Sequence, residues 1–268
     1  MRQAAGVRAF RQRWARIGIL AAAFAVVLSA GFGPARAPKA PQGTATTAAG
    51  SGADAAALLD GYRHVEVASV SDAMEKILGR RMYMSHHMRP IFPAKFAGFA
   101  VTVELKKEEN KDADALNGML AAIDQGGANS VYVMRVEDGA DIAGMGGLMG
   151  TAMQARDFAG AVIDGGVRDV AYLRKIGFPV FAVGIVPSTS VGHYRFAAAN
   201  GPVMCDGVPV NAGDIVAADA DGVVVVPRAK AAEVLAMAQE MDFKEHSMYA
   251  YIEKLKSIEE AVKKFGRL

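Results

Sequence analysis

One short stretch of the chain, residues 144–169, carries residue types that could bind an anion and a divalent metal ion. It opens with four glycines in the sequence GMGGLMG. Glycines leave backbone amides bare where a helix could begin, and such amides favour an anion. The stretch ends with Arg168, whose guanidinium can fork onto a carboxylate, and with Asp169, a hard oxygen ligand. These residues predict an anion-and-metal site.

The same residues also have simpler interpretations. A Gly-rich turn often serves only to redirect the chain, and an adjacent Arg–Asp pair is often a solvated surface pair. Two nucleotide motifs do not fit. A GxGxxG fingerprint counted from Gly144 requires glycine where Met149 stands, and the lysine of a P-loop is missing because no lysine occurs between Lys111 and Lys175.

Repeated β-α units are predicted around this stretch. β-Branched and apolar residues predict strands at 131–136, 161–163 and 179–183, with a helix between the glycines and about Gly160. Strands that alternate with helices favour a parallel sheet, and open α/β sheets bind ligands at the carboxyl ends of their strands. Arg168 and Asp169 follow the strand at 161–163, so they are expected at that edge.

The N-terminal half of the domain predicts a further strand and two helices. A helix is expected at 70–78, with Asp72 as its N-cap and Glu75 three residues later. A strand follows at 99–105. The next helix presents an apolar face that predicts core packing, formed by Leu116, Met119, Leu120 and Ile123.

The C-terminal half changes character after a predicted loop at 184–200. This loop holds polar candidates for a site: Thr189, Ser190, His193, Tyr194 and Arg195. Asp206-Gly207 and Asp221-Gly222 are turn signals between short apolar runs, which predicts antiparallel hairpins. Amphipathic helices are expected at 229–245 and 249–265. Cys205 lies in an apolar run and is predicted to be an inert core residue.

The first 37 residues differ from the rest of the chain. Five arginines precede an uncharged run from Ile17 to Ala35, and small residues follow at Ala35 and Ala37. This order is typical of a secretory signal peptide, so we expect an exported protein. An uncleaved membrane anchor and a misassigned start codon are the alternatives. Residues 38–57 predict a flexible linker, and residues 58–268 form the predicted domain.

The charge of the chain is set largely by this leader. It holds six of the 30 basic residues and no acid, which leaves 24 basic against 28 acidic residues, a net charge of −4. The isoelectric point of 8.6 therefore reflects the leader. No basic surface for nucleic acid is predicted, and we expect membrane contact only if the leader is retained.

Several ordered motifs beyond the central stretch resemble one family. From about Val67 to the C-terminus, the chain is similar to the RraA-like family, which contains the 4-hydroxy-4-methyl-2-oxoglutarate/4-carboxy-4-hydroxy-2-oxoadipate aldolases and the regulator of ribonuclease E activity A. The motifs that carry this resemblance are Ser69–Ala73, Met88–Pro90, Gly98–Val103, Gly146–Asp169, Phe178–Ala182, Pro202–Val210, Gly213–Ile215 and Asp219–Pro227. It implies a layered α/β/β domain with a mixed sheet, in which parallel β-α units precede antiparallel hairpins, and ring-shaped trimers that often pair into hexamers.

The resemblance also implies roles for the central residues. The turn formed by Gly146, Gly147, Leu148 and Met149 would hold a 2-oxo acid through its amides. Arg168 would contact the substrate, and Asp169 would hold Mg²⁺ or Mn²⁺. Many aldolases of the family have glutamate where Gly147 stands, which could change the proton relay or the substrate.

Retro-aldol cleavage of a 4-hydroxy-2-oxo acid, or decarboxylation of oxaloacetate, produces a pyruvate enolate whose charge must be stabilised. A divalent cation can do so, whereas the Schiff-base route needs a lysine that this stretch lacks. The sequence therefore predicts a metal-dependent pyruvate lyase. The alternative from another class is a non-catalytic, protein-binding regulator of a ribonuclease.

Overall fold

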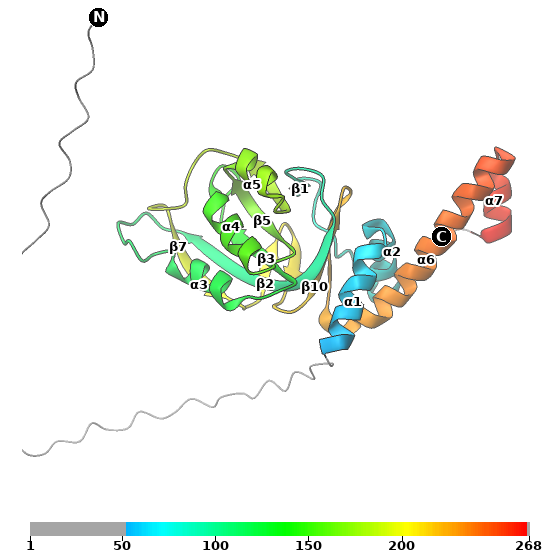
Figure 1. Ribbon diagram of the computed structural model, residues 1–268, viewed down its shortest axis with the longest axis horizontal. Helices are drawn as coiled ribbons and strands as arrows, with labels where there is room; N and C mark the ends of the chain where they lie inside the picture. The colour runs from blue at the N-terminus through cyan, green and yellow to red at the C-terminus, as the bar shows by residue number, and fades with distance from the viewer. Residues whose placement is uncertain (1–51, 267–268) are drawn as a thin grey trace, which may run out of the picture. The chain divides into compact units, whose positions relative to one another are not determined.

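The computed structural model describes residues 52–266 and is built around one mixed β-sheet (Figure 1). The predicted leader and residues 38–51 of the predicted linker lie outside the described residues. Residues 52–57, also expected to be linker, are the first turns of helix α1 (Gly52–His64). No helix within residues 52–266 combines the length and apolarity needed to span a bilayer.

Four parallel strands form the centre of the sheet, in the order β6-β5-β3-β2, and antiparallel strands extend it at both sides. The predicted combination of parallel units followed by antiparallel hairpins is confirmed. The strands are β1 (Arg89–Pro90), β2 (Phe96–Lys107), β3 (Ser130–Val136), β4 (Ala143–Met145), β5 (Gly160–Val167), β6 (Val180–Ile185), β7 (Tyr194–Ala199), β8 (Val203–Cys205), β9 (Val208–Val210), β10 (Ile215–Asp219) and β11 (Gly222–Val226).

Each face of the sheet carries its own hydrophobic core. Leu105, Met134 and Ile163 point to one face, which helices α3 (Asn117–Gln125), α4 (Gly147–Ala155) and α5 (Val170–Ile176) cover. On the other face the central strands pack against the hairpin of β8 and β9, with α1, α2 (Val67–Leu78) and the first part of α6 (Ala231–Leu255) in the same core. The domain is therefore layered, as expected.

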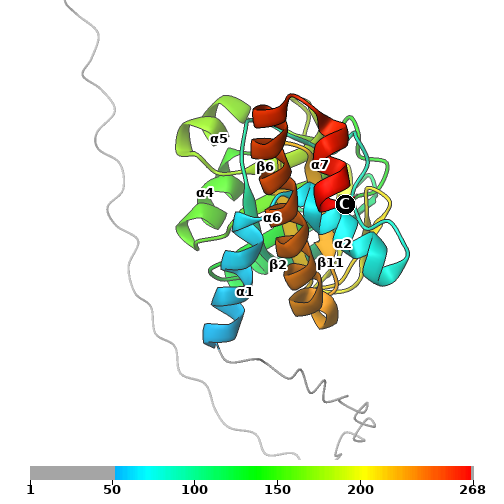
Figure 2. The same cartoon turned by 90° about the vertical axis from the view of Figure 1, so that its right-hand side faces the viewer.

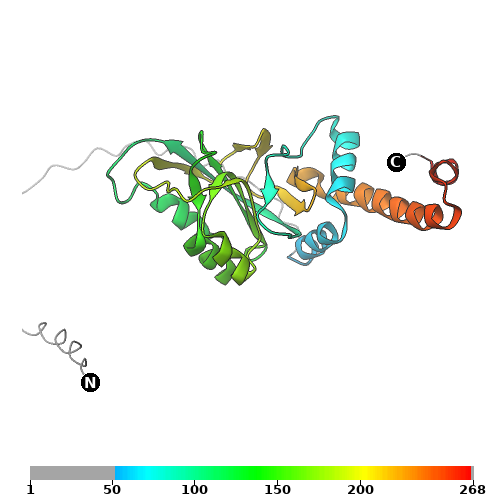
Figure 3. The same cartoon turned by 90° about the horizontal axis from the view of Figure 1, so that it is seen from above.

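The three helices of the second core lie side by side, as the end view in Figure 2 shows. After a 3₁₀ turn at Arg228–Lys230, α6 continues without a break to Leu255. The prediction of separate helices at 229–245 and 249–265 was therefore wrong. Helix α6 ends at the left-handed residue Lys256. Helix α7 (Ile258–Phe265) then packs back against α6 through an edge contact between Tyr251 and Phe265 (Figure 3).

The N-cap of α2 was also predicted wrongly. The helix begins at Val67 after Glu66, so Asp72 lies inside it and is exposed. A residue far along the chain replaces the predicted cap. Asp219, at the end of β10, accepts a hydrogen bond of 2.9 Å from the amide of Val67.

Two predicted segments became longer or more regular than expected. β5 continues past Ile163 to Val167, directly before Arg168. The predicted loop at 184–200 contains strand β7, which pairs antiparallel with the far half of β2. β2 is twelve residues long, and β10 covers only its first part, so the same edge is open to β7.

Candidate functional site

The glycines of the central stretch have two different roles in the structure. β4 pairs with β5, and α4 begins at Gly147 after the extended residue Gly146. A Cβ at Gly144 or Gly150 would lie 2.8 Å from Met134 Sδ or 2.3 Å from Leu173 Cδ2, so these two glycines permit packing. Gly146 and Gly147 instead lie against Arg168 and Asp169. Of the four glycines, these two bring their backbone close to the charged residues of the predicted site.

Asp169 lies between the N-termini of two helices. It is the N-cap residue of α5, with φ of 59°, a left-handed conformation that aspartate tolerates better than most residues. Its side chain does not cap α5. Its Oδ2 accepts a hydrogen bond of 2.8 Å from the amide of Gly147, the first residue of α4. The positive end of the α4 dipole therefore meets the carboxylate.

Arg168 is held beside Asp169 by the loop after β6. Its Nη1 donates to the carbonyl oxygen of Ser188 at 3.1 Å, and its Nε lies 4.0 Å from Asp169 Oδ2. The hydroxyl of Ser188 is fixed in turn, because it donates to Asp141 O and accepts from the amide of Ala143. About half of each charged side chain remains exposed, 44% for Arg168 and 51% for Asp169.

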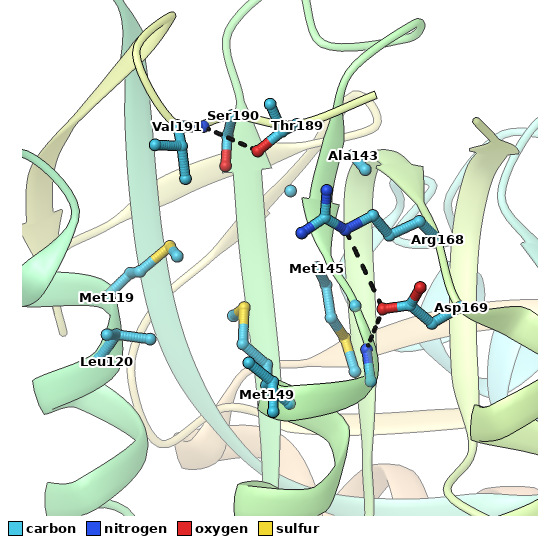
Figure 4. A pocket seen from close by; sticks show the side chains of 14 residues that line it. Met119, Leu120, Ala143, Met145, Met149, Arg168, Asp169, Thr189, Ser190 and Val191 are labelled. Atoms are coloured by element: carbon cyan, nitrogen blue, oxygen red, sulfur yellow. Dashed lines mark hydrogen bonds and ion pairs between the residues drawn. The ribbon is translucent and has the colours of Figure 1, made fainter. Parts of the chain in front are cut away.

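These residues form one wall of a cavity of about 210 Å³ (Figure 4). The guanidinium of Arg168 points into it, with Asp169 beside it. Met119 and Leu120 of α3 lie across from them, and Met149 rises from α4. All six predicted site residues line this cavity. Its lining consists of Met119, Leu120, residues 143–149, Arg168, Asp169, Thr189, Ser190 and Val191.

The amides of the turn are not equivalent. Gly147 N–H already donates to Asp169, so it orients that carboxylate. Within residues 52–266, the amides of Leu148 and Met149 donate to no protein acceptor, as expected at the start of a helix. These two amides are available to an anion, whereas Gly147 acts through Asp169.

The other predicted polar candidates separate into two groups. Thr189 and Ser190 line the cavity. His193, considered as a base, instead contacts the carboxylate of Glu109 through Nδ1 at 2.9 Å. Tyr194 is buried and donates to Glu137 O, and Arg195 pairs with Glu108 and Asp112. Cys205 is buried as predicted, and burial raises the pKa of its thiol.

Sequence reasoning assigned part of the cavity wall to the core. Leu120 was expected in the core face of α3, but 45% of the residue is exposed, and it lines the cavity with Met119. Val191 and the supporting Ser188 were not singled out at all. Helical spacing shows which residues share an apolar face, but not what that face packs against. Only the structure shows that part of this face borders a cavity and does not lie in the core.

Comparison with known proteins identifies the family of this chain. The sequence profile of the RraA-like family, described as Aldolase/RraA, matches residues 67–225, more than half of the chain. The chain belongs to the RraA-like family. One relative of this RraA-like protein is a protein of Halalkalibacterium halodurans named "Putative 4-hydroxy-4-methyl-2-oxoglutarate aldolase". The two are 26% identical over 183 residues, which cover 66% of this chain and 80% of the relative.

Two solved structures share the fold. An uncharacterized protein from Pseudomonas syringae pv. tomato superposes with a TM-score of 0.72 at 28% identity, over 78% of this chain and 94% of the other. RraAS2 of Streptomyces coelicolor, described as an unusual member of the RNase ES inhibitor RraA protein family, superposes with a TM-score of 0.63 at 25% identity. That match covers 74% of this chain and 96% of the other. The family thus contains proteins with names from two functional classes.

Proposed function

We propose that this RraA-like protein is a divalent-metal-dependent lyase that cleaves a 4-hydroxy-2-oxo acid of the 4-hydroxy-4-methyl-2-oxoglutarate type to pyruvate. The observation that carries the proposal is the convergence of Arg168, Asp169 and the free amides of Leu148 and Met149 on one cavity. A 2-oxo acid needs groups of these kinds, because its carboxylate requires donors and its oxo group an electrophile. The names of relatives support the same class.

Retro-aldol cleavage breaks the C3–C4 bond, removes the proton of the C4 hydroxyl and leaves the electron pair on the pyruvate enolate, which is then protonated. Arg168 binds the carboxylate of the pyruvyl part with its remaining N–H groups. The amides of Leu148 and Met149 donate to the same anion and face the charge that develops beside it. Ser188 holds the guanidinium in this orientation.

Asp169 fits a hard divalent cation. Among the described residues, no protein donor reaches its Oδ1, and no group of three His, Cys, Asp or Glu side chains converges there or elsewhere in residues 52–266. One carboxylate suits Mg²⁺ or Mn²⁺, since Mg²⁺ keeps several waters, whereas zinc sites usually have three or four protein ligands. A bound cation would supply Lewis-acid polarisation of the oxo group and the adjacent carboxylate.

Decarboxylation of oxaloacetate is a second candidate activity, favoured by one observation. Of the described residues that line the cavity, Asp169 alone could accept a proton, and the family's frequent glutamate is Gly147 here. Retro-aldol cleavage needs an acceptor for the hydroxyl proton. Decarboxylation does not, because the C3–C4 bond breaks with loss of CO₂ and the enolate takes its proton from solvent.

The test is release of pyruvate by the purified protein, followed through NADH oxidation by lactate dehydrogenase. The substrates are 4-hydroxy-4-methyl-2-oxoglutarate and oxaloacetate, with Mg²⁺ or Mn²⁺ and after chelation with EDTA. We expect turnover that needs the cation and exceeds that of an Asp169→Ala control. If neither substrate yields pyruvate with either cation, the proposed lyase function is wrong, and the alternative of a protein-binding ribonuclease regulator is favoured.

Assembly and export are proposed on separate grounds. Family membership and exposed apolar residues on α6 and α7, such as Phe243 and Ile258, support a homotrimer or hexamer. Light scattering that gives the mass of one chain would contradict it.

The arginine-rich leader supports export to the periplasm or medium, with an uncleaved membrane anchor as the alternative. N-terminal sequencing of native protein should begin near Arg36 or Pro38, and soluble protein that retains Met1 would overturn export.

A further inference from the structure

The hydroxyl group of Ser190 lies at the cavity without a protein partner. Only 5% of this residue is exposed, and it lines the cavity. Its Oγ makes no hydrogen bond to any residue that the structure describes, and Figure 4 shows this oxygen directed into the cavity. A buried hydroxyl that stays unpaired costs free energy, so its expected partner is a group bound in the cavity.

The two hydroxyl groups that precede it in the chain are engaged by the protein. The hydroxyl of Ser188 forms hydrogen bonds with two backbone groups of the segment 141–143. The hydroxyl of Thr189 accepts from the amide of Val191 at 3.2 Å, and Thr189 is only partly buried. Of these three consecutive hydroxyls, that of Ser190 alone is both buried and unpartnered among the described residues.

The backbone holds Ser190 in a fixed position. Its carbonyl oxygen accepts hydrogen bonds from the amides of His193 and Tyr194, at 3.1 and 3.0 Å. The carbonyl oxygen of His193 accepts in turn from the amide of Glu108 at 2.9 Å. The side chain is therefore presented from a supported turn, as a binding group requires.

The position of Ser190 matches the distal part of the proposed substrates. Met149 and Ser190 lie at opposite sides of the cavity, with the guanidinium of Arg168 between them (Figure 4). A substrate held at its first carboxylate by Arg168 and the amides of α4 therefore extends its C4 end toward Ser190. In 4-hydroxy-4-methyl-2-oxoglutarate C4 carries a hydroxyl group, and in oxaloacetate C4 is the second carboxylate. A serine hydroxyl suits both, because it can donate to a carboxylate and can donate to or accept from a hydroxyl.

We propose that Ser190 is a substrate-binding residue whose hydroxyl group hydrogen-bonds to the oxygen carried by C4, the carbon whose bond to C3 breaks. The inference rests on the proposed pyruvate-lyase function and adds a residue that selects substrates with oxygen at this position. In both candidate reactions this oxygen becomes part of a carbonyl group, in the second product of the retro-aldol reaction or in CO₂. Ser190 positions the oxygen and forms no covalent bond.

The first experiment measures ligand binding by calorimetry in the presence of Mg²⁺, with malate and lactate as probes. Both are 2-hydroxy acids that the proposed reactions do not consume, and only malate has a carboxylate at C4. Wild-type protein should bind malate more tightly than lactate. Ser190→Ala should weaken malate binding by about tenfold or more, as expected for a lost hydrogen bond to a charged group, and leave lactate binding unchanged.

Ser69→Ala is the matched control. Ser69 is also buried, with 3% exposed, and its Oγ also has no partner, but it lies in α2 and does not line the cavity. This variant should keep wild-type affinity for both probes. The proposal is overturned if wild-type protein binds malate no more tightly than lactate. It is also overturned if Ser190→Ala weakens both probes equally or neither of them.

The second experiment separates Ser190 from the lyase function. Ser190→Ala should lower kcat/KM for pyruvate release from each substrate that the wild-type protein cleaves. A selective loss of malate binding in this variant, without pyruvate release by the wild-type protein, means that only the lyase function fails. Lyase activity that Ser190→Ala leaves unchanged overturns the role of Ser190 and leaves the lyase function standing.

Discussion

Asp164 and Asp169 lie five residues apart around the end of β5, yet their surroundings differ completely. Asp169 is half-exposed at the cavity and accepts from the amide of Gly147. Asp164 points to the other face of the sheet, beneath the β8–β9 turn, and accepts a hydrogen bond of 2.8 Å from the amide of Asp206. Burial, assisted by the carboxylate of Asp206, raises the pKa of Asp164, although that hydrogen bond and Arg135 oppose the shift.

The difference shows that the strand ending alone does not define a site. Asp164 lies within β5 before Gly165 and Gly166, Asp169 lies just after the strand, and each carboxylate accepts a hydrogen bond from one backbone amide. Asp164 uses its amide contact to fix a hairpin, and Asp206 is itself tied to Ser85 by two hydrogen bonds. Asp169 leaves one oxygen toward a cavity. A structural carboxylate and a candidate ligand can therefore be distinguished by whether the carboxylate borders a cavity.

The largest expected effect belongs to Asp169→Ala. It should abolish cation-dependent lyase activity, because the carboxylate that would hold the cation is lost. The fold should persist at a cost of about 1–3 kcal/mol, because alanine is strained at the φ of 59° and the hydrogen bond from the Gly147 amide is lost. Turnover with and without Mg²⁺, together with thermal melting, measures both. Unchanged turnover and unchanged cation affinity would remove Asp169 from the site.

Arg168→Lys should cost about 2–4 kcal/mol of transition-state stabilisation, judged from the loss of single donors to an oxyanion. That corresponds to roughly 30- to 1000-fold in kcat/KM. An ammonium keeps the charge but cannot reproduce the fork that binds the carboxylate and Ser188 O together. Near-normal kinetics would mean that Arg168 serves only as an ion pair with Asp169.

Gly147→Val should raise KM for pyruvate-forming substrates. Gly147 is the first residue of α4 and its φ is not positive, so the expected effect of valine is steric rather than conformational. A Cβ there would lie 3.0 Å from Tyr172 Cδ1 and 3.4 Å from Asp169 Cβ, and the branched side chain would displace the carboxylate from the Gly147 amide.

A matched control for this substitution is Gly127→Val. Gly127 precedes β3, at the opposite end of the sheet from the cavity, and a Cβ there has no neighbour within 4 Å. We expect this variant to keep the wild-type KM, and both variants to melt near the wild-type temperature. A Gly147→Val enzyme with unaltered kinetics would contradict the role of the turn, and a lost fold would make this glycine purely structural.

Asp164→Asn should have the smallest effect on activity and a pH-dependent effect on stability. Because the pKa of Asp164 is raised in the folded state, its ionisation there destabilises the fold, and stability is lost as pH rises through that pKa. Asparagine does not ionise but can still accept from Asp206. Relative to wild type, the variant should therefore become more stable as pH rises from about 4 toward neutrality. The gain in the free energy of unfolding should stay within about 1 kcal/mol and appear as a higher Tm. A constant difference across this range, or lost lyase activity, would contradict the contrast with Asp169.

Local patterns in the sequence were sufficient for much of the architecture. The apolar strands of the parallel sheet, the helix after the glycines and the turn at Asp206-Gly207 all rest on contacts between near neighbours. Both turn residues have positive φ, 43° and 81°, as a two-residue hairpin loop requires. The position of Arg168 and Asp169 at the carboxyl end of a strand was predictable for the same reason.

Tertiary structure decided the features that depend on distant residues. β7 lacks a clean apolar alternation and became a strand because β2 extends beyond β10 and offers it an open edge. The cap of α2 comes from Asp219, more than 150 residues away, and displaces the local candidate Asp72. Met119 and Leu120 became a cavity wall because of where α3 lies relative to α4. The sequence by itself determined which groups could bind an anion and a cation. Long-range packing decided which backbone amides stay free and which side chains line the cavity around them.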